Sequence, residues 1–224
     1  MNNTFDIGRA VSFPFDENEW VMKSIVGSIF SIIPFVGPGY QVHVVRNYRQ
    51  GKAQVLPENN ELGEVFADGL MVWIAQIIIL LPLFPLSVLM AVFMGIADAG
   101  PAAFVIACPL ALGTIVLMIA YGIPATLVMW MGMIRFTETG NFSSFLQFRD
   151  LWRDVRANMS IMLMLLVWLI VVGFAVALLS SVLWITCVGL FVLGFAQKIV
   201  GGHLIGQAAV ALDTQPAAEE QGTV

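Results

Sequence analysis

Long uncharged stretches alternate with short charged segments along most of the chain. Four such stretches run from Ser24 to Val45, Leu70 to Ala97, Ala99 to Ile134 and Ala157 to Gln197. A helix needs about 20 apolar residues to cross the hydrocarbon core of a bilayer. The second stretch therefore fits one span, the third fits one tilted and bent span, and the last fits two spans that meet near Ser180 and Ser181. The pattern predicts a helical bundle that crosses the membrane several times.

Prolines and glycines interrupt these stretches. The first stretch contains Pro34 to Gly39, where missing amide donors and flexible glycines predict two helical pieces instead of one. Pro82 and Pro85 predict a kink in the second stretch. Pro109 and Pro124 predict kinks in the third. These breaks are explained either as simple kinks or as discontinuous helices that expose backbone carbonyls to a substrate, as in transporters.

One segment, from Asn141 to Asn158, has an amphipathic pattern instead. Its apolar residues recur at helical spacing, whereas arginines, aspartates and a glutamine fill the opposite face. We expect an interfacial helix, either as a strut on the membrane surface or as a docking face for a partner. The apolar stripe comprises Phe145, Phe148, Leu151, Trp152 and Val155.

These patterns predict an all-α fold: a polytopic transmembrane helical bundle with proline-kinked or broken helices and one interfacial amphipathic helix. We expect an N-terminal lead-in over residues 1–15, a single transmembrane domain over 16–210 and a disordered acidic tail over 211–224. The predicted helices cover about 17–33, 36–50, 62–97, 101–135, 143–157 (the interfacial one), 159–180 and 182–210.

Composition supports a membrane protein and excludes other classes. Apolar residues make up 59% of the chain and charged residues 11%, too few to cover the surface of a soluble enzyme. The net charge of −5 argues against a nucleic-acid partner, which would need a basic surface. The lipid bilayer is therefore the first partner that we expect.

The basic residues predict the orientation in a cell (cytoplasmic or inner) membrane. The turns at Asp98 and at Ser180–Ser181 carry no lysine or arginine, which places them outside and the C-terminus in the cytoplasm. The N-terminus lies outside if the first stretch spans once, and inside if it forms a re-entrant or hairpin pair. The basic residues that face the cytoplasm are Arg46, Arg49, Lys52, Arg135, Arg149, Arg153, Arg156 and Lys198.

The sequence contains none of the common catalytic, phosphate-binding or metal-binding motifs, so we expect neither an enzyme nor a bound cofactor or metal. His43 and His203 stand near predicted helix ends and are interpreted as isolated interfacial histidines. The uncharged stretches hold no acidic or basic residue near the membrane midplane, which disfavours an ion-coupled carrier.

The last predicted span carries the most regular polar pattern. Gly194, Lys198, Gly202 and Gly206 lie four residues apart on one face. Small residues at this spacing let another helix approach closely, either within the chain or from a second chain. Lys198 is expected near the cytoplasmic edge of the bilayer, where it either snorkels to the headgroups or forms an ion pair with Asp68.

Several short motifs resemble a known family. They are Phe13-Pro14-Phe15, Trp20, Ile33-Pro34, Gly39-Tyr40, Arg46, Gly51, Leu56-Pro57-Glu58, Gly63, Phe66, Asp68-Gly69-Leu70 and the closing His203-Leu204-Ile205-Gly206-Gln207. In this order and spacing they resemble domain of unknown function 4013, an uncharacterised family of prokaryotic membrane proteins. Asn59-Asn60 departs from the aromatic and acidic residues that are usual in that loop. The resemblance implies a multi-pass membrane protein and no particular activity.

The sequence thus leads to two functional hypotheses. The first is a non-enzymatic scaffold or accessory subunit that contacts a membrane-protein partner, or a second copy, through its cytoplasmic loops and interfacial helix. The alternative is a carrier or passive pathway for a small apolar or lipid-like molecule, which a membrane interior without charges would suit.

Overall fold

The computed structural model describes residues 5–16, 20–52, 54–183 and 187–214. Within these ranges the protein is all-helical, and four helices are long and apolar enough to cross a membrane. The α-helices are α1 (Ile7–Ser12), α2 (Trp20–Phe30), α3 (Val36–Arg49), α4 (Leu62–Leu80), α5 (Leu83–Ala97), α6 (Pro101–Thr139), α7 (Phe148–Ala157), α8 (Met159–Leu183) and α9 (Cys187–Asp213). Short 3₁₀ helices cover Phe13–Asp16, Asn59–Glu61 and Phe142–Phe145.

The central element is α3, the second half of the first apolar stretch. The predicted break is present: α2 ends at Phe30, a turn follows, and α3 begins at Val36 with Gly37 and Pro38 in its first turn. Although α3 contains several polar residues, most of it is buried, because α4 packs on one side and α9 on the other. A polar helix therefore lies at the centre of an apolar protein.

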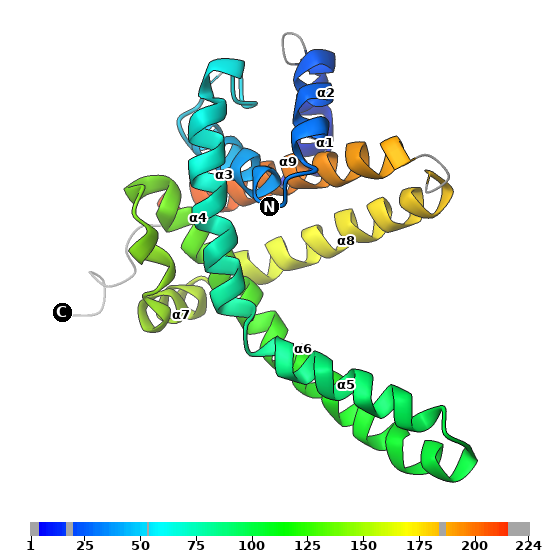
Figure 1. Cartoon of the computed structure of the whole chain (residues 1–224). Coiled ribbons are helices and arrows are strands. Elements are labelled where there is room, and N and C mark those ends of the chain that lie inside the picture. Colours follow the sequence, from blue (N-terminus) through cyan, green and yellow to red (C-terminus); the bar gives the residue numbers. More distant parts are fainter. Residues whose placement is uncertain (1–4, 17–19, 53, 184–186, 215–224) are drawn as a thin grey trace, which may run out of the picture.

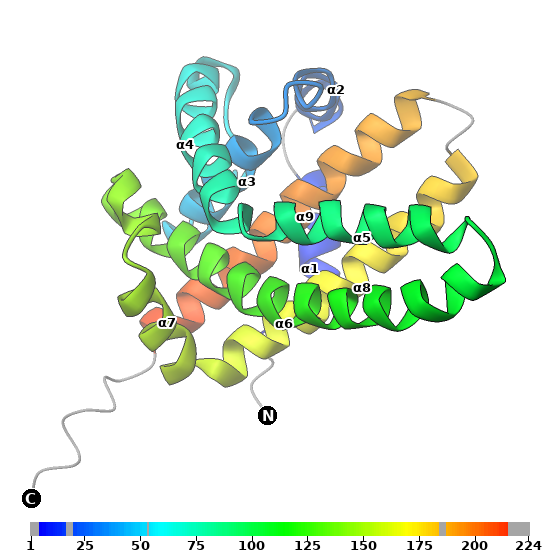
Figure 2. The ribbon, with the colours of Figure 1, turned by 60° about the horizontal axis from the view of Figure 1, so that its bottom comes forward.

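Two helical hairpins extend from this centre (Figure 1). One pairs α5 with the first half of α6, and the other pairs α8 with α9. In Figures 1 and 2, the far ends of both hairpins lie on the side opposite to α7. The amphipathic helix α7 and the turn at Asp98, which carries no lysine or arginine, are thereby separated.

The predicted helix over 62–97 is wrong, because the chain divides into α4 and α5 at Leu81 and Pro82. Proline lacks an amide hydrogen and obstructs the preceding turn, so two prolines three residues apart end the helix instead of kinking it. By contrast, Pro109 and Pro124 lie inside α6, which continues through both positions to Thr139. The lost backbone bonds in α6 are spread along a helix long enough to tolerate them.

Two other predicted boundaries, the ends of α8 and α9, also move. Helix α8 continues past Ser180 to Leu183, because serine at the end of an apolar helix can bond to its own backbone: the Ser181 hydroxyl donates to the Leu178 carbonyl. Helix α9 reaches Asp213, so the predicted disordered tail over 211–224 begins too early; residues 215–224 lie outside the described ranges.

The N-terminal lead-in is part of the folded core. Phe5, Ala10 and Phe13 are buried. The backbone N–H of Asp6 donates to the Gln207 side chain at 2.8 Å, and the Gln207 amide donates back to the Asp6 carbonyl at 3.0 Å. This reciprocal pair attaches α1 to the last turns of α9.

The predicted amphipathic helix is present as α7, but it begins at Phe148 because residues Phe142–Phe145 form a 3₁₀ turn. Its fully buried apolar residues, Leu151 and Val155, pack with residues of α6 and α8 and not against lipid. Phe148 stays exposed, and Arg156 lies over the Trp152 ring at 5.1 Å. The inner half of the apolar stripe is therefore protein core.

Candidate functional site

Close glycine contacts place α3 between its two neighbours. A Cβ atom added to Gly39 would lie 2.0 Å from the backbone oxygen of Val65, and one added to Gly69 would lie 2.1 Å from the oxygen of Phe35. Helices α3 and α4 therefore touch backbone to backbone, which only glycine permits. The sequence motifs contained both residues, but the spacing of residues did not indicate that they meet.

The predicted glycine face of α9 packs within the chain. A Cβ at Gly202 would lie 3.0 Å from the backbone oxygen of Gln41, and one at Gly206 would lie 3.0 Å from the Tyr48 side chain. Both glycines thus accommodate α3. Gly194, the third residue of the predicted face, has no described atom within 4 Å of an added Cβ and takes no part in this contact.

The predicted Lys198–Asp68 ion pair is not formed. Asp68 instead binds Arg46 at 2.9 Å and lies 3.3 Å from the Nε2 atom of His43. His43 and Arg46 are one turn apart on α3 and both face α4, so the carboxylate joins the two helices. His43 is buried at 3% exposure beside Asp68, so it is not isolated as predicted.

His203 is also buried, at 1% exposure. Its ring stacks on Phe13 at 4.6 Å between centroids and meets the edge of Tyr48 at 4.4 Å. Its Nδ1 atom lies 3.0 Å from the Gln207 amide nitrogen. The ring therefore connects the 3₁₀ helix Phe13–Asp16 with α3 and α9. No group of three histidine, cysteine, aspartate or glutamate side chains within the described ranges could hold a metal ion.

Arg49 connects three helices at the charged end. Its guanidinium binds both carboxylate oxygens of Asp213 at 2.8 and 2.7 Å and also binds Glu138. Burial lowers the pKa of Arg49, but the hydrogen bonds to Asp213 and Glu138 outweigh this and raise the pKa above its usual value. The C-terminal turn of α9 is thereby fastened to α3 and α6.

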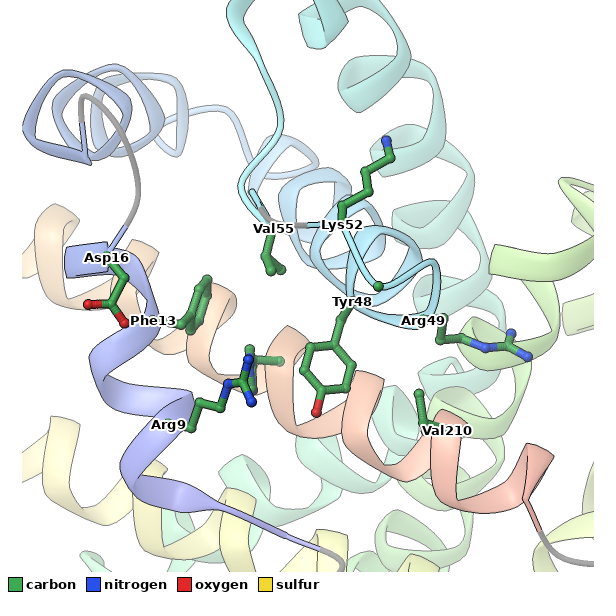
Figure 3. Close-up of a pocket in the computed structure, with 10 residues that line it drawn as sticks. Arg9, Phe13, Asp16, Tyr48, Arg49, Lys52, Val55 and Val210 are labelled. Carbon is green, nitrogen blue, oxygen red and sulfur yellow. The ribbon is translucent and has the colours of Figure 1, made fainter.

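A basic pocket of about 500 Å³ lies beside this arginine (Figure 3). Arg9 and Tyr48 point into the space between α1 and α3, whereas Arg49 points away toward its carboxylates. Asp16 also lines the pocket and offsets part of its positive charge. The Arg49 charge is already balanced by Asp213 and Glu138. We therefore consider this pocket the weaker candidate for a ligand site.

A second cavity, of about 320 Å³, lies among the apolar helices and is the stronger candidate. Its walls come from α3, α4, α6, α8 and α9. We call it the lysine cavity, because Lys198 is the only charged residue among its lining residues. Its main polar lining residues are Gln41, Gln76, Thr126, Gln197 and Lys198, with Trp130 beside them.

Lys198 lies near the middle of α9, about 16 Å along the helix axis from Cys187, the first residue of the helix within the described ranges. Its alkyl chain packs on the first turn of α3: a Cβ at Gly37 would lie 3.4 Å from the Lys198 Cγ atom. Within the described part of the chain, Lys198 has no hydrogen bond or ion pair.

The three glutamines of the lysine cavity were missed in the sequence. Gln41 and Gln76 stand within otherwise apolar stretches, and Gln197 precedes Lys198. None of the three makes a hydrogen bond among the described residues, so their amide groups remain available. Their spread over the sequence hid the pattern, since α3, α4 and α9 bring them together only in the fold. An amide inside an apolar run is the signal that would have found them.

The fold and the lysine cavity thus define a helical membrane protein with a polar site among its apolar helices. The chain belongs to the family described as "Protein of unknown function (DUF4013)", whose sequence model matches residues 26–201. This confirms the resemblance. Phe13-Pro14-Phe15, Trp20 and the segment from His203 to Gln207 lie outside the matched residues. No curated protein and no solved structure matches the chain.

Proposed function

We propose that this membrane protein binds a small amphiphilic molecule with an anionic group in the lysine cavity, as a non-enzymatic carrier or passive pathway. The observation that supports the proposal is the Lys198 side chain, which lines a cavity among apolar helices without an ionic partner in the described part of the chain. An unpaired charge near the membrane midplane is costly and persists mainly where function requires it. A bound anion would supply the missing partner.

The surroundings of Lys198 favour an anion further. The first turn of α3, at Gly37, lies against the lysine, and the N-terminal end of a helix carries a partial positive charge. Gln41, Gln76 and Gln197 offer amide N–H donors around the same space. Asp68, the predicted partner of Lys198, instead binds Arg46 and lies against His43.

Native mass spectrometry of the protein released from its own membrane tests the proposal. We expect the wild type to carry a bound small molecule, and Lys198→Gln to lose it. Lys52→Gln is the matched control, because it removes the same charge from an exposed lysine outside the cavity. Equal occupancy of the wild type and Lys198→Gln would overturn the proposal.

An accessory subunit is the second candidate, and it too is non-enzymatic. None of the residues of α5 is buried, and the α5–α6 hairpin extends away from the rest of the protein (Figure 1). A hairpin of this kind could contact another membrane protein in the bilayer. Purification in a mild detergent discriminates the two candidates: stoichiometric co-purification of one membrane protein supports the accessory role, and a single chain with a bound small molecule supports the carrier.

The proposed orientation places the basic end and the C-terminus in the cytoplasm of a cell membrane. We expect that, after replacement of the native cysteines, Asn60→Cys is protected from an impermeant thiol reagent in intact cells. Ala99→Cys, in the turn between α5 and α6, should react from outside. Reaction of Asn60→Cys together with protection of Ala99→Cys would mean that the orientation is inverted.

A further inference from the structure

Resting on the anion site proposed above, we infer that the ligand is a single-chain amphiphile with a carboxylate head, and that it enters the lysine cavity sideways from the bilayer, between α6 and α8. The head would lie against Lys198, and the apolar chain would lie between the two helices. The polar lining of the cavity would bind the head, and the apolar surfaces of α6 and α8 at its opening would bind the chain.

The charge of the cavity selects the head. Lys198 is the single cation among its lining residues, and no arginine is present there. Phosphate groups are bound most strongly by several cations or by the paired donors of arginine, whereas one ammonium balances one negative charge. Amide donors such as those of Gln41 and Gln76 complete the hydrogen bonds of a carboxylate. A carboxylate therefore fits the cavity better than a phosphate does.

The position of the opening selects the route. Thr126 and Trp130 of α6 line the cavity on one side, and Leu166 and Ile170 of α8 line it on the other. Ile170 is 60% exposed, so the cavity reaches the outer surface of the protein at this point. Both helices are among those long and apolar enough to cross a membrane. The opening between them consequently faces hydrocarbon and not water.

The size of the cavity and the surface outside it require an apolar chain. A volume of about 320 Å³ lies near the lower end of the range for small-molecule sites, so it holds a head and the beginning of a chain. Beyond the opening, exposed apolar side chains continue along both helices, among them Ile123 of α6 and Val167 of α8. Because lipid tails are as apolar as these side chains, the chain would be held there by van der Waals packing and not by removal from water.

Fluorescence quenching of Trp130 measures both parts of the inference. The variant used retains Trp130 and has phenylalanine at the other tryptophans; a matched variant retains Trp152 of α7 instead, outside the cavity. Three brominated quenchers are compared in lipid nanodiscs. They are 9,10-dibromostearate, its uncharged methyl ester and the short, water-soluble 2,3-dibromopropionate.

We expect dibromostearate to quench Trp130 at a concentration about tenfold lower than its methyl ester does, since one charge-assisted contact is lost in the ester. Lys198→Gln should remove this advantage, and Trp152 should show none. Dibromopropionate that quenches Trp130 as well as dibromostearate, and depends on Lys198, would overturn the sideways entry of a chain and leave the anion site intact. No dependence on Lys198 with any quencher would reject both.

A second measurement uses the wild-type chain, in case the single-tryptophan variants fold poorly. A fatty acid that carries a photoreactive diazirine on its chain is bound in nanodiscs, and the labelled residues are located by mass spectrometry. We expect labelling of α6 near Trp130 and of α8 near Ile170, with competition by unlabelled stearate. Uniform labelling of exposed apolar residues, including those of α5, would contradict the inference.

Discussion

Alanine at Gly39 or at Gly69 should lower the free energy of unfolding by about 3 kcal/mol or more, at the upper end of the cost of overpacking. In both cases the new methyl group would meet a backbone carbonyl oxygen of the facing helix, at 2.0 and 2.1 Å. A backbone cannot rotate aside as a side chain does, so α3 and α4 would have to separate. Unfolding in mixed detergents measures the loss.

Gly63→Ala, also on α4, is the matched control. No described atom lies within 4 Å of a Cβ at Gly63. Alanine has the higher helix propensity, so we expect this change to stabilise the protein by roughly 0.5–1 kcal/mol. Alanine would thus destabilise the protein at Gly69 and stabilise it at Gly63, two positions of α4. Similar losses at Gly39 and Gly63 would contradict the close contact.

The second large effect is expected from Asp68→Asn. This change leaves Arg46 without its carboxylate and places a neutral amide beside the buried His43. Loss of a hydrogen-bonded charge partner costs about 1.5–3 kcal/mol, and exposure of Asp68 at 16% keeps the cost within that range. Thermal unfolding in detergent should show a lower melting temperature, whereas Glu64→Gln on the exposed face of α4 should not.

A double-mutant cycle separates the pair from general damage. Arg46→Gln and Asp68→Asn together should cost less than the sum of their single losses, because the second change removes a partner that the first has already left unpaired. Strict additivity would show that Asp68 does not stabilise the protein through Arg46. The same cycle with Lys198→Gln in place of Arg46→Gln should be additive, since Lys198 does not contact Asp68.

The sequence predicted which parts of the chain are helical and apolar, because spans and their interruptions depend on local composition. The break before Val36 follows from the prolines and glycines there. At Pro82 the sequence predicted an interruption, but the predicted helix over 62–97 treated it as a kink and not as a division, since the same residue type kinks one helix and ends another according to tertiary contacts. Charge counts likewise placed the basic residues at one end.

The site is formed by contacts between segments that are distant in the sequence, and local sequence patterns do not predict such contacts. Lys198 was recognised, but the cavity that it lines is formed by five helices from distant parts of the chain, and its predicted partner Asp68 lies against α3 instead. Gln41, Gln76 and Gln197 belong to three different helices, so no spacing in the sequence connects them. The glycine pattern of α9 did predict close packing, but only the fold shows that α3 is what packs there.

The central claim is that the Lys198 ammonium is balanced by an anion bound in the lysine cavity. A cryo-electron microscopy map of the protein in nanodiscs made from its native membrane tests this most directly. We expect elongated density in the cavity, with its head within about 3 Å of the Lys198 Nζ atom, the distance of a charge-assisted hydrogen bond. A cavity that holds no such density, with Lys198 bound to a side chain of the protein itself, would contradict the account.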